Sequence, residues 1–266
     1  MSRLQILLSC MHEQGAAIAE RMNIRCDAVI VNQCDADAET VVQGNSGGTL
    51  LCIDSSERGL SRSRNMAMAR AQGELCLLAD DDETFADDVA DTVARAFDEH
   101  PEAAILLFNV GNSSATRYRR ARRVGYRGAM RTSSSSIAFR RNSVLKEGIR
   151  FDVEMGSGTG HGACEETKFL FDSMRRGLTV VGVPYIIATK KLHSASKWFE
   201  GYTRDYFLQR GWATQRFMGP FFATLYAFYT AARQYPKYRR TLSPLVALTA
   251  FLKGVYSPNM YAKDAE

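Results

Sequence analysis

The sequence predicts an α/β protein whose central sheet is mostly parallel and is flanked by helices. Short apolar runs at residues 4–9, 28–32, 49–53 and 75–79 alternate with segments of helical pattern, and each run ends in polar residues. Strands that alternate with helices in this way are typical of a doubly wound parallel sheet. The chain has 266 residues, which is enough for one large domain with a buried core.

Helices are expected between and after these strands. Ser61 is a suitable N-cap for a helix that runs to about Gln72, where Gly73 ends it. Apolar residues at helical spacing across residues 89–97 indicate another helix before Pro101. Further strands are expected at residues 103–110, 135–139 and 178–183, and further helices at 16–22 and 167–176.

The last part of the chain is helical in character, so we divide the protein into an α/β domain at residues 1–197 and a C-terminal helical region at 198–266. Residues 217–232 carry no charge, but they number 16 and include Pro220. A bilayer-spanning helix needs about 20 residues. The region therefore packs on the α/β domain or lies as an interfacial helix on a membrane. In the second case its basic residues, Arg233, Lys237, Arg239, Arg240 and Lys253, would meet anionic lipids; otherwise they form a solvated face.

The composition indicates a reducing compartment. The chain is 45% hydrophobic and 24% charged, with a net charge of +5 and a pI of about 8.9. Its six cysteines form no C-x-x-C pair and have no zinc-binding spacing with histidine, so we expect buried thiols. No signal peptide is visible, so we expect the protein in the cytoplasm, with peripheral contact at the inner face of the cell membrane as an option. The mild positive charge suits anionic ligands.

Four acidic residues, Asp80, Asp81, Asp82 and Glu83, follow the apolar run at 75–79. Neighbouring carboxylates repel one another and are costly to bury. Such an oxygen-rich cluster suits a hard cation, Mg²⁺ or Mn²⁺, which in turn binds phosphates. By itself the cluster fits a solvated loop or an acidic helix start equally well.

The ends of the other predicted strands are also polar. In open α/β sheets, ligands bind at the carboxyl ends of the strands. We therefore expect one polar site that includes the acidic cluster and a nucleotide-binding set. That set comprises Ser9 and Met11 after the first run, Asn32, Gln33 and Asp35 after the second, and Asp54 after the third.

A basic segment precedes the acidic strand and opens a helix. It contains Arg58, Ser61, Arg62, Arg64 and Asn65. Exposed N–H groups at a helix start bind phosphate, and guanidinium groups add paired donors. We expect this segment to hold a diphosphate; surface arginines on an amphipathic helix are the alternative.

The two segments together resemble the family 2 glycosyltransferases, which have a GT-A (Rossmann-like) fold. The resemblance rests on Arg-Gly-Leu-Ser-Arg-Ser-Arg-Asn at 58–65 and on Gly-Glu-Leu-Cys-Leu-Leu-Ala-Asp-Asp-Asp at 73–82, which ends in a D-x-D motif. It implies that Asp82 is the main metal ligand and that Asp80 and Asp81 touch ribose or metal.

The same resemblance implies that Asp35 reads the nucleotide base and that Asp54 shares this role.

A second match to the family is a glycine-rich acceptor loop at 155–163, followed by Cys164, Glu165 and Glu166 where the family has Gly-Glu-Asp. The resemblance implies that Glu166 is the general base and that Glu165 contacts the acceptor or adjusts the pKa of Glu166. It also places Gly158, Gly160 and His161 at the acceptor. Cys164 departs from the usual glycine, and Glu166 is longer than the usual aspartate. Without the family pattern, two acids at a helix start would simply complement the helix dipole.

A third match is His193, which the resemblance makes a metal or diphosphate ligand, with Trp198 as a platform for the acceptor sugar. A histidine in a surface turn is the alternative reading. The resemblance covers about residues 1–200.

We therefore expect a metal-dependent, inverting glycosyltransferase. It would move a sugar from a nucleotide diphosphate donor, a UDP-sugar by preference, to a hydroxyl of a saccharide or lipid-linked acceptor, in the synthesis of a cell-surface polysaccharide or glycolipid. The alternatives are a sugar-phosphate nucleotidyltransferase, which needs a glycine-rich N-terminal loop that residues 9–13 lack, and a non-catalytic nucleotide-sugar binder. An arginine-rich stretch at 117–131 binds a diphosphate-linked lipid or is a solvated loop; no nucleic-acid partner is expected.

Overall fold

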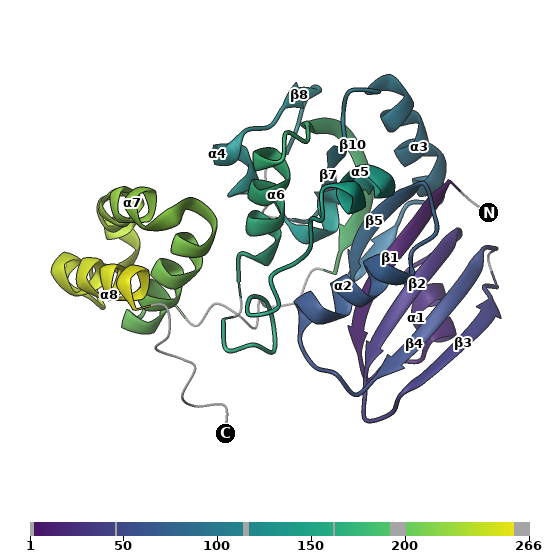
Figure 1. Ribbon diagram of the computed structural model, residues 1–266, viewed down its shortest axis with the longest axis horizontal. Helices are drawn as coiled ribbons and strands as arrows, with labels where there is room; N and C mark the ends of the chain where they lie inside the picture. Colours follow the sequence, from purple (N-terminus) through teal and green to yellow (C-terminus); the bar gives the residue numbers. More distant parts are fainter. Residues whose placement is uncertain (1–2, 46, 114–116, 162, 192–200, 258–266) are drawn as a thin grey trace.

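The computed structural model describes residues 3–45, 47–113, 117–161, 163–191 and 201–257. Within these residues, ten strands form one sheet in the order β3-β4-β2-β1-β5-β9-β7-β10-β6, and β8 pairs with β10 (Figure 1). The strands are β1 (Leu4–Met11), β2 (Asp27–Gln33), β3 (Ala38–Gln43), β4 (Thr49–Ser55), β5 (Leu75–Asp80), β6 (Glu83–Phe85), β7 (Ile105–Gly111), β8 (Arg122–Arg123), β9 (Ile137–Arg140) and β10 (Val180–Lys190).

The parallel core of the sheet consists of the four predicted strands, which are confirmed as β1, β2, β4 and β5. Their side chains are apolar on both faces because helices cover both sides. The register places Ser9 opposite Asp80, and Asn32 opposite both Cys10 and Asp54. The polar residues at the strand ends therefore lie side by side along one edge of the sheet.

The outer strands depart from the parallel pattern. β9 is antiparallel and lies between β5 and β7, while β3, β6 and β8 are antiparallel to their neighbours. The strand predicted at 135–139 begins instead with a short 3₁₀ helix, η1 (Ser134–Ser136). The strand predicted at 178–183 continues as β10 to Lys190. This brings that lysine to residues 80–83, which we call the acidic turn.

The helices form two layers. α1 (Gly15–Arg21) and α3 (Val89–Glu99) pack on one face of the sheet, and α2 (Leu60–Arg70) and α6 (Glu165–Arg175) pack on the other. The shorter helices are α4 (Tyr126–Ala129) and α5 (Arg141–Lys146). The basic stretch at 117–131 supplies β8 and α4, and the arginines of β8 are exposed.

The prediction that Ser61 caps α2 is wrong. The helix begins at Leu60, and Gly59 is its cap, with φ 118° and ψ 127°. A backbone conformation with such a positive φ favours glycine. Ser61 lies in the first turn, where its hydroxyl donates to the carbonyl of Met155 at 2.6 Å.

The C-terminal region is made of α7 (Arg204–Tyr238) and α8 (Pro244–Tyr256). α7 is broken at Gly219, which has φ 77° and precedes Pro220. A Cβ on Gly211 of α7 would lie 2.0 Å from the carbonyl oxygen of Phe251, and one on Gly254 of α8 would lie 2.0 Å from that of Leu208. The two helix backbones are therefore in direct contact.

The first half of α7 packs on the α/β domain, as one of the two sequence-based alternatives proposed. Trp212 and Phe217 are buried in the same core as Phe169 of α6. Arg216 pairs with Asp152, with Nη2 to Oδ2 at 2.9 Å. None of the described helices combines the length and the apolar character needed to cross a membrane. The predicted boundary at residue 197 falls outside the described residues and stays a prediction.

Candidate active site

Hydrogen bonds link polar side chains at the carboxyl ends of the parallel strands to one another and to the start of α2. Asn32 Nδ2 donates to Asp54 Oδ1 at 2.7 Å. The backbone N–H of Gly59 donates to Gln33 Oε1 at 2.8 Å. The hydroxyl of Ser63 in α2 donates to that of Ser9 at 2.9 Å. These side chains are held in place by their neighbours, which suits a preformed binding site.

Arg58 holds the loops that follow β2 and β4. Its Nη1 donates to three backbone carbonyls at 2.8–3.1 Å, those of Cys34, Ser55 and Ser56. Its Nη2 contacts Asp35 Oδ1 at 2.5 Å, so Arg58 also orients the aspartate expected to read the base. Asp35 and Met11 are exposed at the rim of this edge, and Arg62 lies at the surface beside Glu57.

Arg64 does not lie where the sequence suggested. We expected it to reach a diphosphate, but its side chain is 1% exposed. Nη2 donates to Asp80 Oδ1 at 2.7 Å, and Nη1 donates to Glu165 Oε1 at 2.9 Å. The guanidinium also packs over the ring of Phe151. Arg64 therefore joins the end of β5 to the start of α6.

Ser61 and Asn65 also bind the chain itself instead of facing the polar edge. Ser61 is buried against the glycine-rich loop and donates a hydrogen bond to the carbonyl of Met155. Asn65 exchanges two hydrogen bonds of 2.8 Å with the backbone of Phe151. Both residues fix the loop that leads to α6, which explains their polar side chains without a ligand.

The acidic turn is tightly surrounded. Asp80 Oδ2 accepts a hydrogen bond from Ser134 at 2.8 Å. Burial alone would raise the pKa of Asp80, but Arg64, Lys190 and these hydrogen bonds together lower it. Lys190 Nζ lies 3.1 Å and 3.3 Å from the two carboxylate oxygens of Asp82.

Asp81 lies between the carboxylates of Asp80 and Asp82. Burial raises its pKa, and repulsion from Asp80 and Asp82 raises it further. Glu83 is completely buried, and burial followed by repulsion from Asp80 raises its pKa to about 8. A bound cation would relieve this repulsion, so the donor set suits a hard divalent metal.

The side chains of the described residues are not arranged as a metal site. Among the residues that the structure describes, no group of three or more His, Cys, Asp or Glu side chains has the arrangement of a metal site. His193 and Trp198, the third match of the sequence, lie outside the described residues.

The glycine-rich loop reaches the start of α2. Gly156, Gly158 and Gly160 have φ values of 98°, 83° and 78°, which favour glycine. The backbone N–H of Leu60 donates to the carbonyl of Ser157 at 2.9 Å. At the end of the loop, the His161 ring stacks on Trp212 of α7, with 3.6 Å between ring centroids. The loop thus lies between α2 and α7.

Glu165 and Glu166 are the first two residues of α6. Their charges are favourable at a helix N-terminus. Burial raises the pKa of Glu166 to about 8, with repulsion from Glu165 as the second cause. Cys164 precedes them at φ 77°, which is the conformation that the family's glycine would adopt freely, and its Sγ lies 2.9 Å from Arg210 Nη1.

Several residues of this site were missed by the sequence reasoning. Lys190, Ser134, Arg210 and Trp212 reach it from β10, η1 and α7. Each is separated from its partner by more than 45 residues, so no local spacing could indicate the contact.

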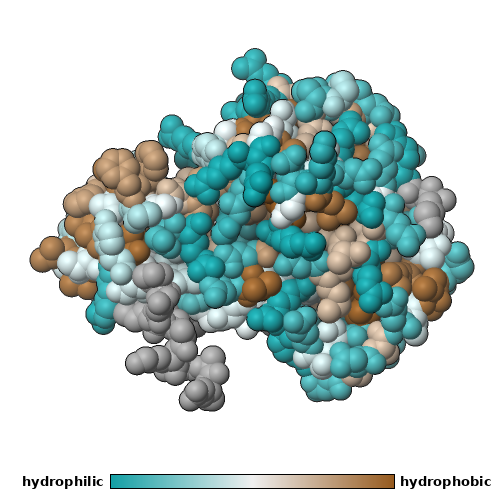
Figure 2. All heavy atoms as spheres, in the orientation of Figure 1, coloured by the Kyte–Doolittle hydropathy of each residue, from teal (hydrophilic) through white to brown (hydrophobic). Residues whose placement is uncertain are grey.

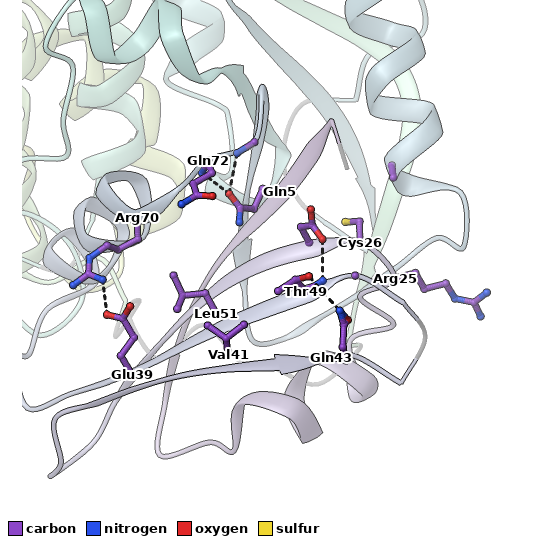
Figure 3. A pocket seen from close by; sticks show the side chains of 14 residues that line it. Gln5, Arg25, Cys26, Glu39, Val41, Gln43, Thr49, Leu51, Arg70 and Gln72 are labelled. Carbon is purple, nitrogen blue, oxygen red and sulfur yellow. Dashed lines mark hydrogen bonds and ion pairs between the residues drawn. The ribbon is translucent and has the colours of Figure 1, made fainter. Parts of the chain in front are cut away.

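The groove shown in Figure 3 is not part of this site. Its lining includes Gln5, Asp27 and Thr49, which lie at the amino ends of β1, β2 and β4. An ion pair between Arg70 and Glu39 closes one side. The groove thus lies at the amino ends of the strands, whereas the acidic turn lies at their carboxyl ends.

A parallel sheet with an acidic turn at its edge and a glycine-rich loop beside it defines a GT-A glycosyltransferase. Residues 19–167 match the model of the family described as glycosyl transferase family 2, and the chain belongs to that family. No curated protein matches the chain.

Solved structures share this fold. S. aureus TarS 1–349, in complex with UDP-GlcNAc, aligns over 96% of this chain and 82% of its own, with 14% identity and a TM-score of 0.60. The mannosyltransferase PcManGT from Pyrobaculum calidifontis, in complex with GDP-Man and Mn²⁺, aligns over 100% of this chain and 76% of its own, with 13% identity and a TM-score of 0.51. At these identities the likeness concerns the fold alone.

Replacing Arg64 with methionine should destabilise the protein by about 3–5 kcal/mol, because Asp80 and Glu165 would both lose the buried guanidinium with which they pair. Chemical denaturation measures this loss. The matched control is Arg62→Met, on the exposed side of the same helix, which should cost less than about 1 kcal/mol. Equal effects of the two substitutions would contradict the bridging role.

Proposed function

We propose that this protein is an inverting glycosyltransferase that moves a sugar from a nucleotide diphosphate donor to a hydroxyl group of a saccharide or lipid-linked acceptor. The observation that supports this proposal is the chain of contacts Asp80–Arg64–Glu165, which joins the end of β5 to the start of α6, where Glu166 is the second residue. A cell-surface polysaccharide or glycolipid is the proposed product.

The polar edge of the sheet is the proposed donor site. Asp35 and Asp54 would read the base, with Asn32 and Arg58 holding them in position. Ser9, Met11 and Gln33 would complete the nucleotide site. We favour a uridine nucleotide; TarS and PcManGT were solved with UDP-GlcNAc and GDP-Man respectively.

The acidic turn is the proposed site of Mn²⁺ or Mg²⁺, with Asp80, Asp81 and Asp82 as oxygen ligands and His193 as a further ligand. When bound, such a cation neutralises charge that develops on the departing diphosphate. Arg62, on the exposed side of α2, would donate to the same diphosphate. Lys190 now balances Asp82 and is a second positive group on that side of the turn.

Glu166 is the proposed general base. It would take the proton from the acceptor hydroxyl while that oxygen attacks the anomeric carbon, and direct displacement inverts that centre. A carboxylate with a pKa of about 8 is a stronger base than an exposed glutamate. Glu165, held by Arg64, keeps that pKa high. Gly158, Gly160, His161 and Trp198 would lie along the acceptor.

The membership of the chain in a glycosyltransferase family argues against the nucleotidyltransferase that the sequence left open. A non-catalytic binder has no observation in its favour, whereas the raised pKa of Glu166 suits a general base.

Glu166→Gln should lower the rate of sugar transfer by about 10²–10⁴-fold, since the amide cannot accept the hydroxyl proton. Calorimetry should show UDP affinity unchanged, because the base lies on the acceptor side. Glu102→Gln, on the surface before β7, serves as the control and should leave both measurements unaltered. A parallel loss of UDP affinity would remove Glu166 from the role of base.

The rate should also depend on pH through Glu166. The base works only when ionised, so kcat/KM should rise with pH and level off above about pH 8. Glu165→Gln removes the neighbouring negative charge, which lowers the pKa of Glu166 and moves the rise to lower pH. The amide oxygen introduced by this substitution still accepts a hydrogen bond from Arg64. An identical pH profile in the variant would show that the two glutamates do not interact.

Asp82→Asn should weaken Mn²⁺ binding by at least about tenfold, as measured by calorimetry in the presence of UDP. The amide keeps the shape of the side chain but removes the charge that attracts the cation. Asp91→Asn, on the exposed side of α3, is the control and should bind Mn²⁺ like the unmodified protein. Unweakened Mn²⁺ binding to Asp82→Asn would exclude Asp82 as a ligand.

A further inference from the structure

The second half of α7 and the neighbouring α8 expose an unusual number of large apolar side chains. Figure 2 shows hydrophobic side chains, in brown, gathered over α7 and α8. Their exposed fractions range from 40% to 69%. We call them the aromatic face: Phe221, Phe222, Leu225, Phe228, Tyr229 and Tyr235 of α7, with Leu245, Val246 and Tyr256 of α8.

The pattern of α7 is the reverse of that of a water-exposed helix. Its buried side after the break carries small residues, Ala223, Ala227 and Ala231, while aromatic residues such as Phe221 and Phe228 point outward. Contiguous exposed apolar surface of this kind marks an interaction site. The aromatic face therefore needs a partner.

Charge identifies the partner. Residues 206–257 contain seven Arg and Lys residues and no Asp or Glu. Five of these basic residues are exposed, and four of them lie toward the end of α7: Arg233, Lys237, Arg239 and Arg240, with Lys253 on α8. A positively charged rim around aromatic side chains complements an anionic lipid surface.

We propose that the aromatic face docks on a lipid bilayer with anionic headgroups, independently of the sugar-transfer reaction. The aromatic side chains would enter the boundary between headgroups and acyl chains, and the five exposed basic residues would contact the headgroups. The described helices do not span a membrane, so the helices lie along the surface.

A second copy of the chain is a poorer occupant. A symmetric pairing through this face would bring the exposed basic residues of both copies together, and residues 206–257 contain no acidic residue to balance them. A bilayer supplies both the apolar layer and the negative charge that the face lacks.

Docking would also orient the acceptor loop. His161 of that loop stacks on Trp212 in the first half of α7, and the same helix continues into the aromatic face. Arg216 anchors this half of α7 to Asp152 of the α/β domain.

Cosedimentation of the full chain with vesicles tests the proposal. The protein should bind vesicles of phosphatidylcholine with 30% phosphatidylglycerol at least about tenfold more tightly than pure phosphatidylcholine vesicles. High salt should weaken this binding, because it screens the headgroup charge. Absence of binding to anionic vesicles, or equal binding to both compositions, would overturn the proposal.

Two double variants separate the contribution of apolar contacts to vesicle binding from that of charge. Phe222→Ser with Phe228→Ser removes apolar contacts, and Arg239→Gln with Arg240→Gln removes charge; each pair should reduce vesicle binding at least about fivefold. Both pairs are exposed, so the melting temperature and UDP binding should stay as in the parent. Val41→Ser, an exposed apolar residue on β3, is the control and should bind vesicles normally. Unchanged vesicle binding in both paired variants, or a dimer in light scattering that Phe222→Ser with Phe228→Ser dissociates, would refute membrane docking.

Discussion

One buried guanidinium holds the two sides of the candidate site together. Arg64 is charged, almost completely excluded from water, and paired with Asp80 on β5 and Glu165 on α6. A buried charge is tolerated only when its partners are in place, so the end of β5 and the start of α6 must form together. Pairing with Arg64 also favours the negative charge of Glu165, which lies next to Glu166. The geometry of the proposed reaction depends on this arrangement.

Local patterns explain why much of the fold was predictable. β1, β2, β4 and β5 are short apolar runs with polar ends, and such runs give a signal within a few residues. The insertion of β9 between β5 and β7, and the length of β10, depend on pairing between distant segments and leave no such signal. The start of α2 was misplaced because serine is a strong capping residue, whereas the backbone at Gly59 needs a conformation that only the fold reveals.

The same distinction applies to the site. The acidic residues at Asp80–Asp82 and the pair at α6 are conspicuous in the sequence, because like charges rarely stand together without a reason. Their partners are not conspicuous. Arg64 looks like any arginine on an amphipathic helix, and nothing near Lys190 connects it with Asp82, 108 residues earlier. Sequence thus indicates the charges, while only the structure shows what balances them.

The close packing of α7 against α8 at Gly211 and Gly254 has a mechanical consequence. Each glycine lies against a backbone carbonyl of the opposite helix, where only a hydrogen atom fits. Neither helix can slide or roll along the other without driving a side chain into the main chain. The two helices therefore behave as one rigid unit, which is attached to the α/β domain through the first half of α7. Swinging the pair as a whole would require the buried packing of Trp212 and Phe217 against the α/β domain to come apart.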